Sequence, residues 1–240
     1  MKALRSNDRL PQGQRKIVYP ESDGKPMAET DVHRIQMNYL IDALGVRFES
    51  APQVYVSGNM LLYWEAGAPR KCVSPDVFVV KGVEKGLRRV FKTWEEKNRA
   101  PCVVIEVSSE STKGEDLGRK FRLYRDTLRV KEYYIYDPLL EYLPGRMKAW
   151  ELKGGAYVQR FVLEGRVASR ELGLDLVDKD GVLRLVDPKT RWELRGLKEA
   201  EAALKQEEGA RAEAEAARAE AEERARKLEE ELDRLRRKGR

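Results

Sequence analysis

Two acidic residues and one lysine near the middle of the chain are of types that do chemistry together. Glu106 lies inside the apolar run Cys102–Val107, whose β-branched residues predict a buried strand. An unpaired buried carboxylate is costly, so it is normally paired, protonated or bound to a metal. Asp76 follows a proline at the start of another apolar run, Val77–Val80, and Lys120 lies on the flank of a predicted helix.

These side chains suit the hydrolysis of a phosphodiester. Two carboxylates from neighbouring strands form an oxygen-rich site of the kind that Mg²⁺ or Mn²⁺ prefers. Such an ion polarises a phosphoryl oxygen and activates water, and an ammonium group stabilises the developing negative charge. Asp76 also suits a turn, and Lys120 also suits a solvated surface. Glu106 also suits a structural ion pair with a cation of the predicted helix, Arg119, Lys120 or Arg122.

The elements predicted around these residues indicate a mixed α/β fold with helices packed on a sheet. A helix is expected from Thr30 or Asp31 to Leu44, closed by Gly45. Its buried face is predicted to consist of Val32, Ile35, Tyr39, Leu40 and Ala43. The runs Val54–Val56 and Met60–Trp64, joined by Gly58 and Asn59, predict a hairpin.

A second helix is expected from about Glu115 to Thr127, and Tyr133–Tyr136 predicts a strand after it. The buried face of that helix is predicted to consist of Leu117, Phe121, Tyr124 and Leu128. Residues 82–98 predict a loop or short helix, and residues 148–186 predict three or four short strands in a β meander.

Composition divides the chain into a basic arm at residues 1–26, a folded domain at 27–195 and a long helix at 196–240. In a heptad reading of the helix, the a positions are Leu197, Leu204, Arg211, Arg218, Ala225 and Leu232. The d positions are Ala200, Glu207, Ala214, Ala221, Leu228 and Leu235. Alanine and leucine fill nine of these twelve positions, which predicts a coiled coil and a dimer. A single helix stabilised by its own charges is the alternative.

Charge and composition narrow the class of partner. Residues 1–196 carry a net charge of +7, which permits a polyanionic partner. One basic and aromatic stretch suits either nucleic-acid contact or a solvated surface: Arg88, Arg89, Lys92, Trp94 and Lys97. The two cysteines lack metal-ligand spacing and predict reduced thiols. Without a signal peptide or an apolar run of roughly 18 residues, we expect a cytoplasmic protein with no membrane partner.

Four motifs follow one another along the chain: SPDVFVV, VVIEVSSEST, EDLGRKFRLY and VKEYYIYDP. Their order and spacing resemble the bacterial Uma-type family of restriction-endonuclease-like proteins, within the PD-(D/E)XK nuclease superfamily, from about Met27 to Asp187. The resemblance implies a core of helix, three strands, helix and strand, with a Mg²⁺-dependent site that cleaves DNA. It implies that Asp76 and Glu106 hold the metal. Because Ser108 occupies the usual lysine position, it implies that Lys120 is the catalytic lysine.

The resemblance also assigns Glu29 as a secondary, third acidic position. His33 is a further secondary candidate, either lining the site or structural, and Gln36 and Asp116 are candidates to support it. We therefore expect a Mg²⁺-dependent endodeoxyribonuclease that dimerises through its C-terminal helix. The alternatives are an inactive nuclease fold that binds DNA or protein, and a metal-free glycosidase with a carboxylate pair.

Overall fold

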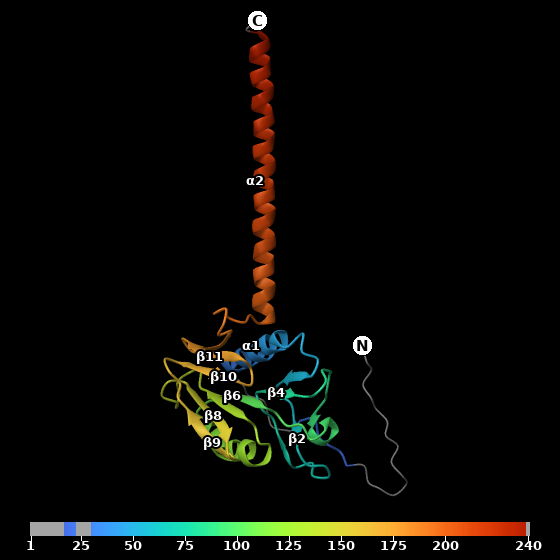
Figure 1. Cartoon of the computed structure of the whole chain (residues 1–240), viewed down its shortest axis with the longest axis vertical. Helices are drawn as coiled ribbons and strands as arrows, with labels where there is room; N and C mark the ends of the chain where they lie inside the picture. The colour runs from blue at the N-terminus through green and yellow to red at the C-terminus, as the bar shows by residue number, and fades with distance from the viewer. Residues whose placement is uncertain (1–16, 23–29, 239–240) are drawn as a thin grey trace, which may run out of the picture. The chain divides into compact units, whose positions relative to one another are not determined.

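The computed structural model describes residues 17–22 and 30–238 (Figure 1). The chain divides into two compact units, residues 1–196 and 197–240. The first unit combines helices with three sheets, so the predicted mixed α/β fold is confirmed. The second unit is one long helix.

The first unit is built on a six-stranded sheet with the strand order β1-β4-β6-β7-β8-β9. These strands are β1 (Val54–Ser57), β4 (Val77–Lys81), β6 (Val103–Val107), β7 (Glu132–Tyr136), β8 (Met147–Lys153) and β9 (Ala156–Arg160). Only β6 and β7 are parallel neighbours in this sheet. Parallel strands need a crossover, and the helical segment 113–127 supplies it.

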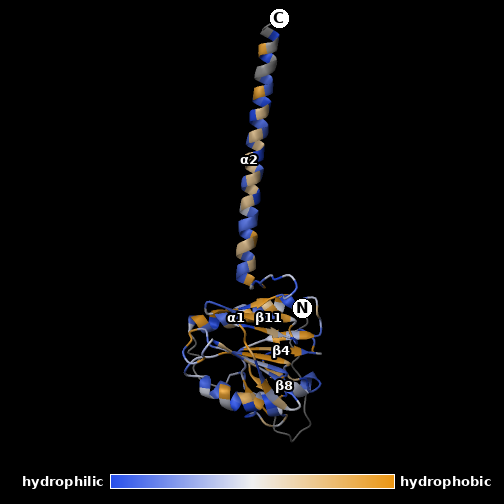
Figure 2. Ribbon diagram, turned by 60° about the vertical axis from the view of Figure 1, so that its left-hand side comes forward, coloured by the Kyte–Doolittle hydropathy of each residue, from blue (hydrophilic) through white to orange (hydrophobic). Residues whose placement is uncertain are grey.

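Successive side chains of the central strands point to opposite faces of this sheet, and both faces are buried. Val79 and Ile105 face a core shared with α1 (Asp31–Arg47) and an antiparallel sheet of β10 (Arg166–Ser169), β11 (Leu174–Lys179) and β12 (Val182–Val186). Phe78 and Val104 face a second core shared with segment 113–127 and a small sheet of β3 (Cys72–Val73), β2 (Leu62–Tyr63) and β5 (Phe91–Lys92). In both ribbon views α1 and β11 lie on the same side of β4, and the hydrophobic residues concentrate in the strands (Figure 2).

Helix α1 begins where the sequence predicts, with the Thr30 hydroxyl accepting a hydrogen bond from the His33 N–H at 3.2 Å. It continues past Gly45 to Arg47, so the predicted end is wrong. The predicted face is also partly wrong, because Val32 and Ile35 are 39% and 63% exposed. Gln36 is buried instead, because its side-chain amide bonds both the N–H and the C=O of Leu183 in β12 at 2.9 Å each.

Two predicted strand pairings are also corrected. The hairpin around Gly58 does not form, because β1 pairs with β4 while β2 pairs with β3 and β5. Residues 148–186 do not form a single meander, because β8 and β9 extend the main sheet and only β10–β12 form a separate meander. The stretch 82–98 contains β5 and a 3₁₀ helix, Thr93–Glu96.

Segment 113–127 is helical, as predicted, but contains π-helical turns over Glu115–Lys120 and Leu123–Thr127. The N–H of Leu128 accordingly donates to the C=O of Leu123, five residues earlier, at 3.0 Å. This wider turn changes which face is buried: Leu117 is 37% exposed, whereas Asp116 is 1% exposed.

Helix α2 (Leu197–Lys238) is hydrophilic over most of its length, with hydrophobic residues at intervals (Figure 2). Its described leucines, Leu197, Leu204, Leu228 and Leu235, are each more than half exposed. Ion pairs four residues apart, such as Arg211 with Glu215, run along it. None of the described helices combines the length and the apolar composition needed to cross a bilayer.

Candidate active site

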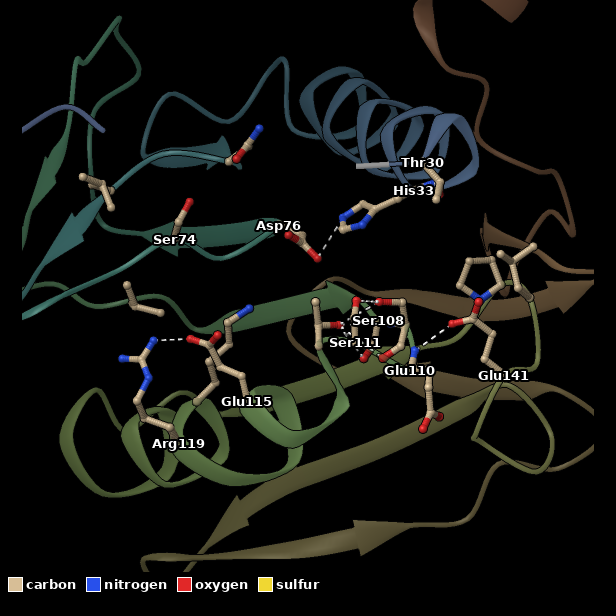
Figure 3. Close-up of a pocket in the computed structure, with 18 of the residues that line it drawn as sticks. Thr30, His33, Ser74, Asp76, Ser108, Glu110, Ser111, Glu115, Arg119 and Glu141 are labelled. Carbon is tan, nitrogen blue, oxygen red and sulfur yellow. Dashed lines mark hydrogen bonds and ion pairs between the residues drawn. The ribbon is translucent and has the colours of Figure 1, made fainter. Parts of the chain in front are cut away.

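A cleft of about 940 Å³ lies where β6 and β7 end and β4 begins. Its lining includes Lys120 and the serine- and threonine-rich loop 108–112. Asp76 and His33 also line it, with their side chains directed toward each other (Figure 3). Asp76, directly before β4, and Lys120, in segment 113–127, therefore reach one cavity.

Strand register brings Asp76 and Glu106 together. Val77 is opposite Ile105 in the antiparallel pair of β4 and β6, so the next position places Asp76 opposite Glu106. The Asp76 N–H donates to Glu106 Oε2 at 3.2 Å, and Asp76 Oδ2 accepts from the Val107 N–H at 2.8 Å. Each acid is thus fixed by the backbone of the other strand.

Glu106 is fully buried beneath this cleft and is bonded through both oxygens. Its Oε1 accepts a hydrogen bond from the Tyr124 hydroxyl at 2.6 Å, and its Oε2 lies 3.0 Å from Lys120 Nζ. Lys120 is 12% exposed and lies equally close, 3.0 Å, to Asp116 Oδ1. The buried carboxylate is therefore balanced by an ammonium group that also lines the cleft.

Segment 113–127 places these partners around Glu106, because its wide turns align residues that are four positions apart. Asp116, Lys120 and Tyr124 occupy one buried side and converge on Glu106 and on one another. Asp116 is anchored in turn by the Ser108 hydroxyl, which donates to its Oδ2 at 2.6 Å. π-helical turns of this kind occur frequently at functional sites.

The pKa values of Asp76 and Glu106 are shifted in opposite directions. Burial acts to raise the pKa of the Asp76 carboxyl, but contact with His33, the charge of Lys120 and the Val107 N–H outweigh it, so the pKa lies below its usual value. Burial raises the pKa of Glu106 well above its usual value, against the charge of Lys120. Burial would lower the pKa of Lys120, yet Glu106, Asp116 and Asp76 raise it, so the amine stays protonated.

The structure brings three predicted residues together, Asp76, Glu106 and Lys120, and adds one secondary candidate. His33 lines the cleft, with its Nε2 3.2 Å from Asp76 Oδ2. Glu29 lies outside the described residues.

The predicted basic and aromatic stretch does not line this cleft. Arg88 pairs with Glu96 at 2.8 Å and covers the Tyr55 ring, while Lys92 pairs with Glu95 at 2.9 Å. Arg89 is 70% exposed and pairs with Glu21, and Trp94 packs against Tyr19. Their contact with nucleic acid stays a prediction.

Sequence reasoning missed two supports of the site. The sequence predicts Tyr124 only as a core residue, although the spacing Asp116, Lys120, Tyr124 marks three polar groups four residues apart. Gly58 was expected to form a hairpin turn. A Cβ at that position would lie 1.9 Å from the backbone oxygen of Asp76, so only glycine allows this close approach.

Asp76 offers one carboxylate oxygen at the cleft that suits a hard divalent cation. Asp76 Oδ1 has no bonding partner among the described residues, and Asp76 lines the cleft. No group of three or more histidine, cysteine or acidic side chains forms a cage among those residues. Mg²⁺ does not require one, because it usually keeps several waters and binds one or two carboxylates plus substrate phosphates.

A model described as "Putative restriction endonuclease" matches residues 7–177. That match puts the chain in the restriction-endonuclease-like class. The chain belongs to the Uma2 family, and the resemblance read from its motifs is confirmed.

Among solved structures, the chain is similar to a crystal structure titled as a putative nuclease belonging to DUF820 from Anabaena variabilis ATCC 29413. The two share 13% sequence identity with a TM-score of 0.48, over 66% of this chain and 83% of the other. No curated protein matches the chain.

Proposed function

We propose that the chain is a Mg²⁺-dependent endodeoxyribonuclease built on a restriction-endonuclease-like core of helix, three strands, helix and strand. The observation that carries the proposal is the reciprocal bonding between Asp76, which lines the cleft together with Lys120, and the buried Glu106. The net charge of +7 on residues 1–196 favours a polyanionic substrate such as DNA.

Each residue has a distinct role in this proposal. Asp76 stays ionised at neutral pH and, with Glu106, would hold Mg²⁺ or Mn²⁺. When bound, the ion polarises a phosphoryl oxygen and lowers the pKa of a water molecule. Lys120 keeps its positive charge and stabilises the negative charge that develops on the scissile phosphate. His33 and the Val107 N–H orient Asp76.

Metal-dependent cleavage tests this assignment. Enzymes accelerate such reactions by at least ~10⁶-fold, or ~8 kcal/mol, more than one lysine supplies. Cleavage of a supercoiled plasmid should therefore require Mg²⁺ or Mn²⁺, and Asp76→Asn and Glu106→Gln should reduce it to the metal-free level. Glu95→Gln, which removes an exposed acid outside the cleft, is the matched control. Full activity of both active-site variants would refute the mechanism.

One observation favours a second candidate, an inactive adaptor that binds DNA or protein. Glu106 is fully buried with both oxygens already bonded, as in a structural ion-pair network. Thermal melting separates the two functions. Mg²⁺ at 100 times its Kd should stabilise a nuclease by about 2.7 kcal/mol, whereas an adaptor without a metal site should show no shift.

We further propose that the chain self-associates through α2. Its exposed leucines occupy heptad a and d positions, which are the positions buried in a coiled coil.

A further inference from the structure

The apolar and charged core positions of α2 are arranged in a nearly mirror-symmetric order along the helix. Leu197 and Leu204 lie near one end, and Leu228 and Leu235 lie near the other. Between them, the core positions are occupied by charged residues and alanine: Glu207, Arg211, Ala214, Arg218, Ala221 and Ala225. This order distinguishes between the two orientations in which a pair of helices can associate.

A parallel, in-register pair would face each core residue with its own counterpart. Arg211 would meet Arg211, Arg218 would meet Arg218, and Glu207 would meet Glu207 of the second copy. Three central layers would each bury two like charges, which is destabilising. The parallel pair would also set Leu232 against Leu232, and against this one additional leucine contact stand the three like-charge layers.

An antiparallel pair removes every one of these like-charge layers. In the register that aligns Leu197 with Leu235 of the second copy, Leu204 faces Leu228. The same register sets each charged core residue against an alanine: Arg211 against Ala221, Arg218 against Ala214, and Glu207 against Ala225. Four leucines thus meet leucine, Leu232 faces Ala200, and each charged core side chain meets a short one.

The central arginines already adopt conformations that suit this arrangement. Arg211 Nε donates to Glu215 at 3.0 Å, and Arg218 Nε donates to Glu222 at 2.9 Å. Both acids occupy the e position beside the core, so each guanidinium turns toward the flank. The aliphatic part of the arginine then remains to cover the facing alanine.

We propose that α2 pairs with α2 of a second copy in the antiparallel orientation, in the register that places Leu204 against Leu228. The inference rests on the proposed self-association through α2 and is independent of nuclease activity. At 1.5 Å per residue, the two Leu197 residues lie about 57 Å apart, so the two nuclease units join the helix pair at opposite ends. That separation equals roughly 17 base pairs of duplex DNA at 3.4 Å each.

Cysteine cross-linking in the full-length chain tests the orientation. Leu204→Cys, Leu228→Cys and the double variant are treated with a short bismaleimide and resolved by denaturing electrophoresis. In the antiparallel pair, equivalent positions lie about 36 Å apart, so neither single variant cross-links to itself. The double variant, and a mixture of the two single variants, should form covalent dimers.

Two controls accompany the experiment. The parent chain carries the same Cys72 and Cys102, and Ala216→Cys places a thiol at an outward-facing f position, so neither should cross-link. Light scattering gives the mass of each variant before treatment. A dimer in which Leu204→Cys links to itself would overturn the orientation alone. A monomer at micromolar concentration would overturn the self-association on which it rests.

Discussion

Replacing Lys120 by methionine should destabilise the first unit strongly, because the lysine is the only cation within 4 Å of the buried Glu106 among the described residues. Its Nζ lies 3.0 Å from both Glu106 Oε2 and Asp116 Oδ1, and its side chain is 12% exposed. Removing one partner of a buried ion pair costs about 3–5 kcal/mol. We expect about 3 kcal/mol near neutral pH, because the Tyr124 hydroxyl and the Asp76 N–H still bond Glu106.

The loss should depend on pH with a defined sign. Burial already raises the pKa of Glu106 in the folded protein, and removing Lys120 raises it further. A carboxyl whose folded-state pKa exceeds its unfolded value, near 4.5, binds a proton more tightly when folded. The free-energy cost of ionising Glu106 in the folded protein is therefore absent below about pH 4.5, and it grows as the pH rises. Lys120→Met should lose more stability at pH 7.5 than at pH 5.

Urea unfolding followed by tryptophan fluorescence measures this effect. All four tryptophans precede Leu197, so the signal reports the first unit and not α2. Lys113→Met is the matched control, because it removes a partly exposed lysine paired with Glu110, a contact worth about 0–1 kcal/mol. Glu106→Gln combined with Lys120→Met should recover part of the loss. A cost below about 1 kcal/mol that does not change with pH would refute the reasoning.

Two further predictions concern the support of the site and its thiols. Gly58→Ala forces a Cβ against the backbone oxygen of Asp76, so it should lower the free energy of unfolding by about 1–3 kcal/mol and weaken the Mg²⁺-induced rise in Tm. The control is Gly45→Ala in α1, where the Cβ meets open space, and it should stabilise the protein by about 0.5–1 kcal/mol. Equal effects of the two substitutions on unfolding would contradict the clash. Burial raises the pKa of the Cys102 thiol to about 11, so a thiol reagent at pH 8 should modify the half-buried Cys72 rapidly and Cys102 only after denaturation. Two fast-reacting thiols in the native protein would contradict this burial.

The sequence was sufficient to predict that Asp76 and Glu106 lie together, because strand position alone decides that geometry. Glu106 is unusual as a carboxylate inside an apolar strand, and Asp76 directly precedes the neighbouring strand. Once β4 and β6 pair as antiparallel neighbours, register alone brings the two acids together. The sequence predicts Lys120 on the flank of an α-helix, and in the structure it lies in a π-helical turn with its ammonium group in contact with Glu106.

The sequence was insufficient where distant partners decided the outcome. Gln36 looked like a polar position on α1, but its partner is the backbone of Leu183, 147 residues away. Periodicity favoured Ile35 for the core, yet Ile35 is 63% exposed, because local pattern carries no information about which face meets a second sheet. Gly58 correctly indicates a place where two backbone segments approach closely, but the second segment is at Asp76 and not the other strand of a hairpin.

The sheet β10–β12 supports the candidate active site, although none of its residues lines the cleft. Gln36 clamps α1 to the backbone of Leu183, and the Tyr39 hydroxyl accepts from the Leu185 N–H at 3.1 Å. α1 in turn holds His33 against Asp76. The meander β10–β12 therefore supports α1, which forms one wall of the acidic site. Truncating the chain before β10 would detach that wall, and the smallest fragment able to hold the site intact extends through β12.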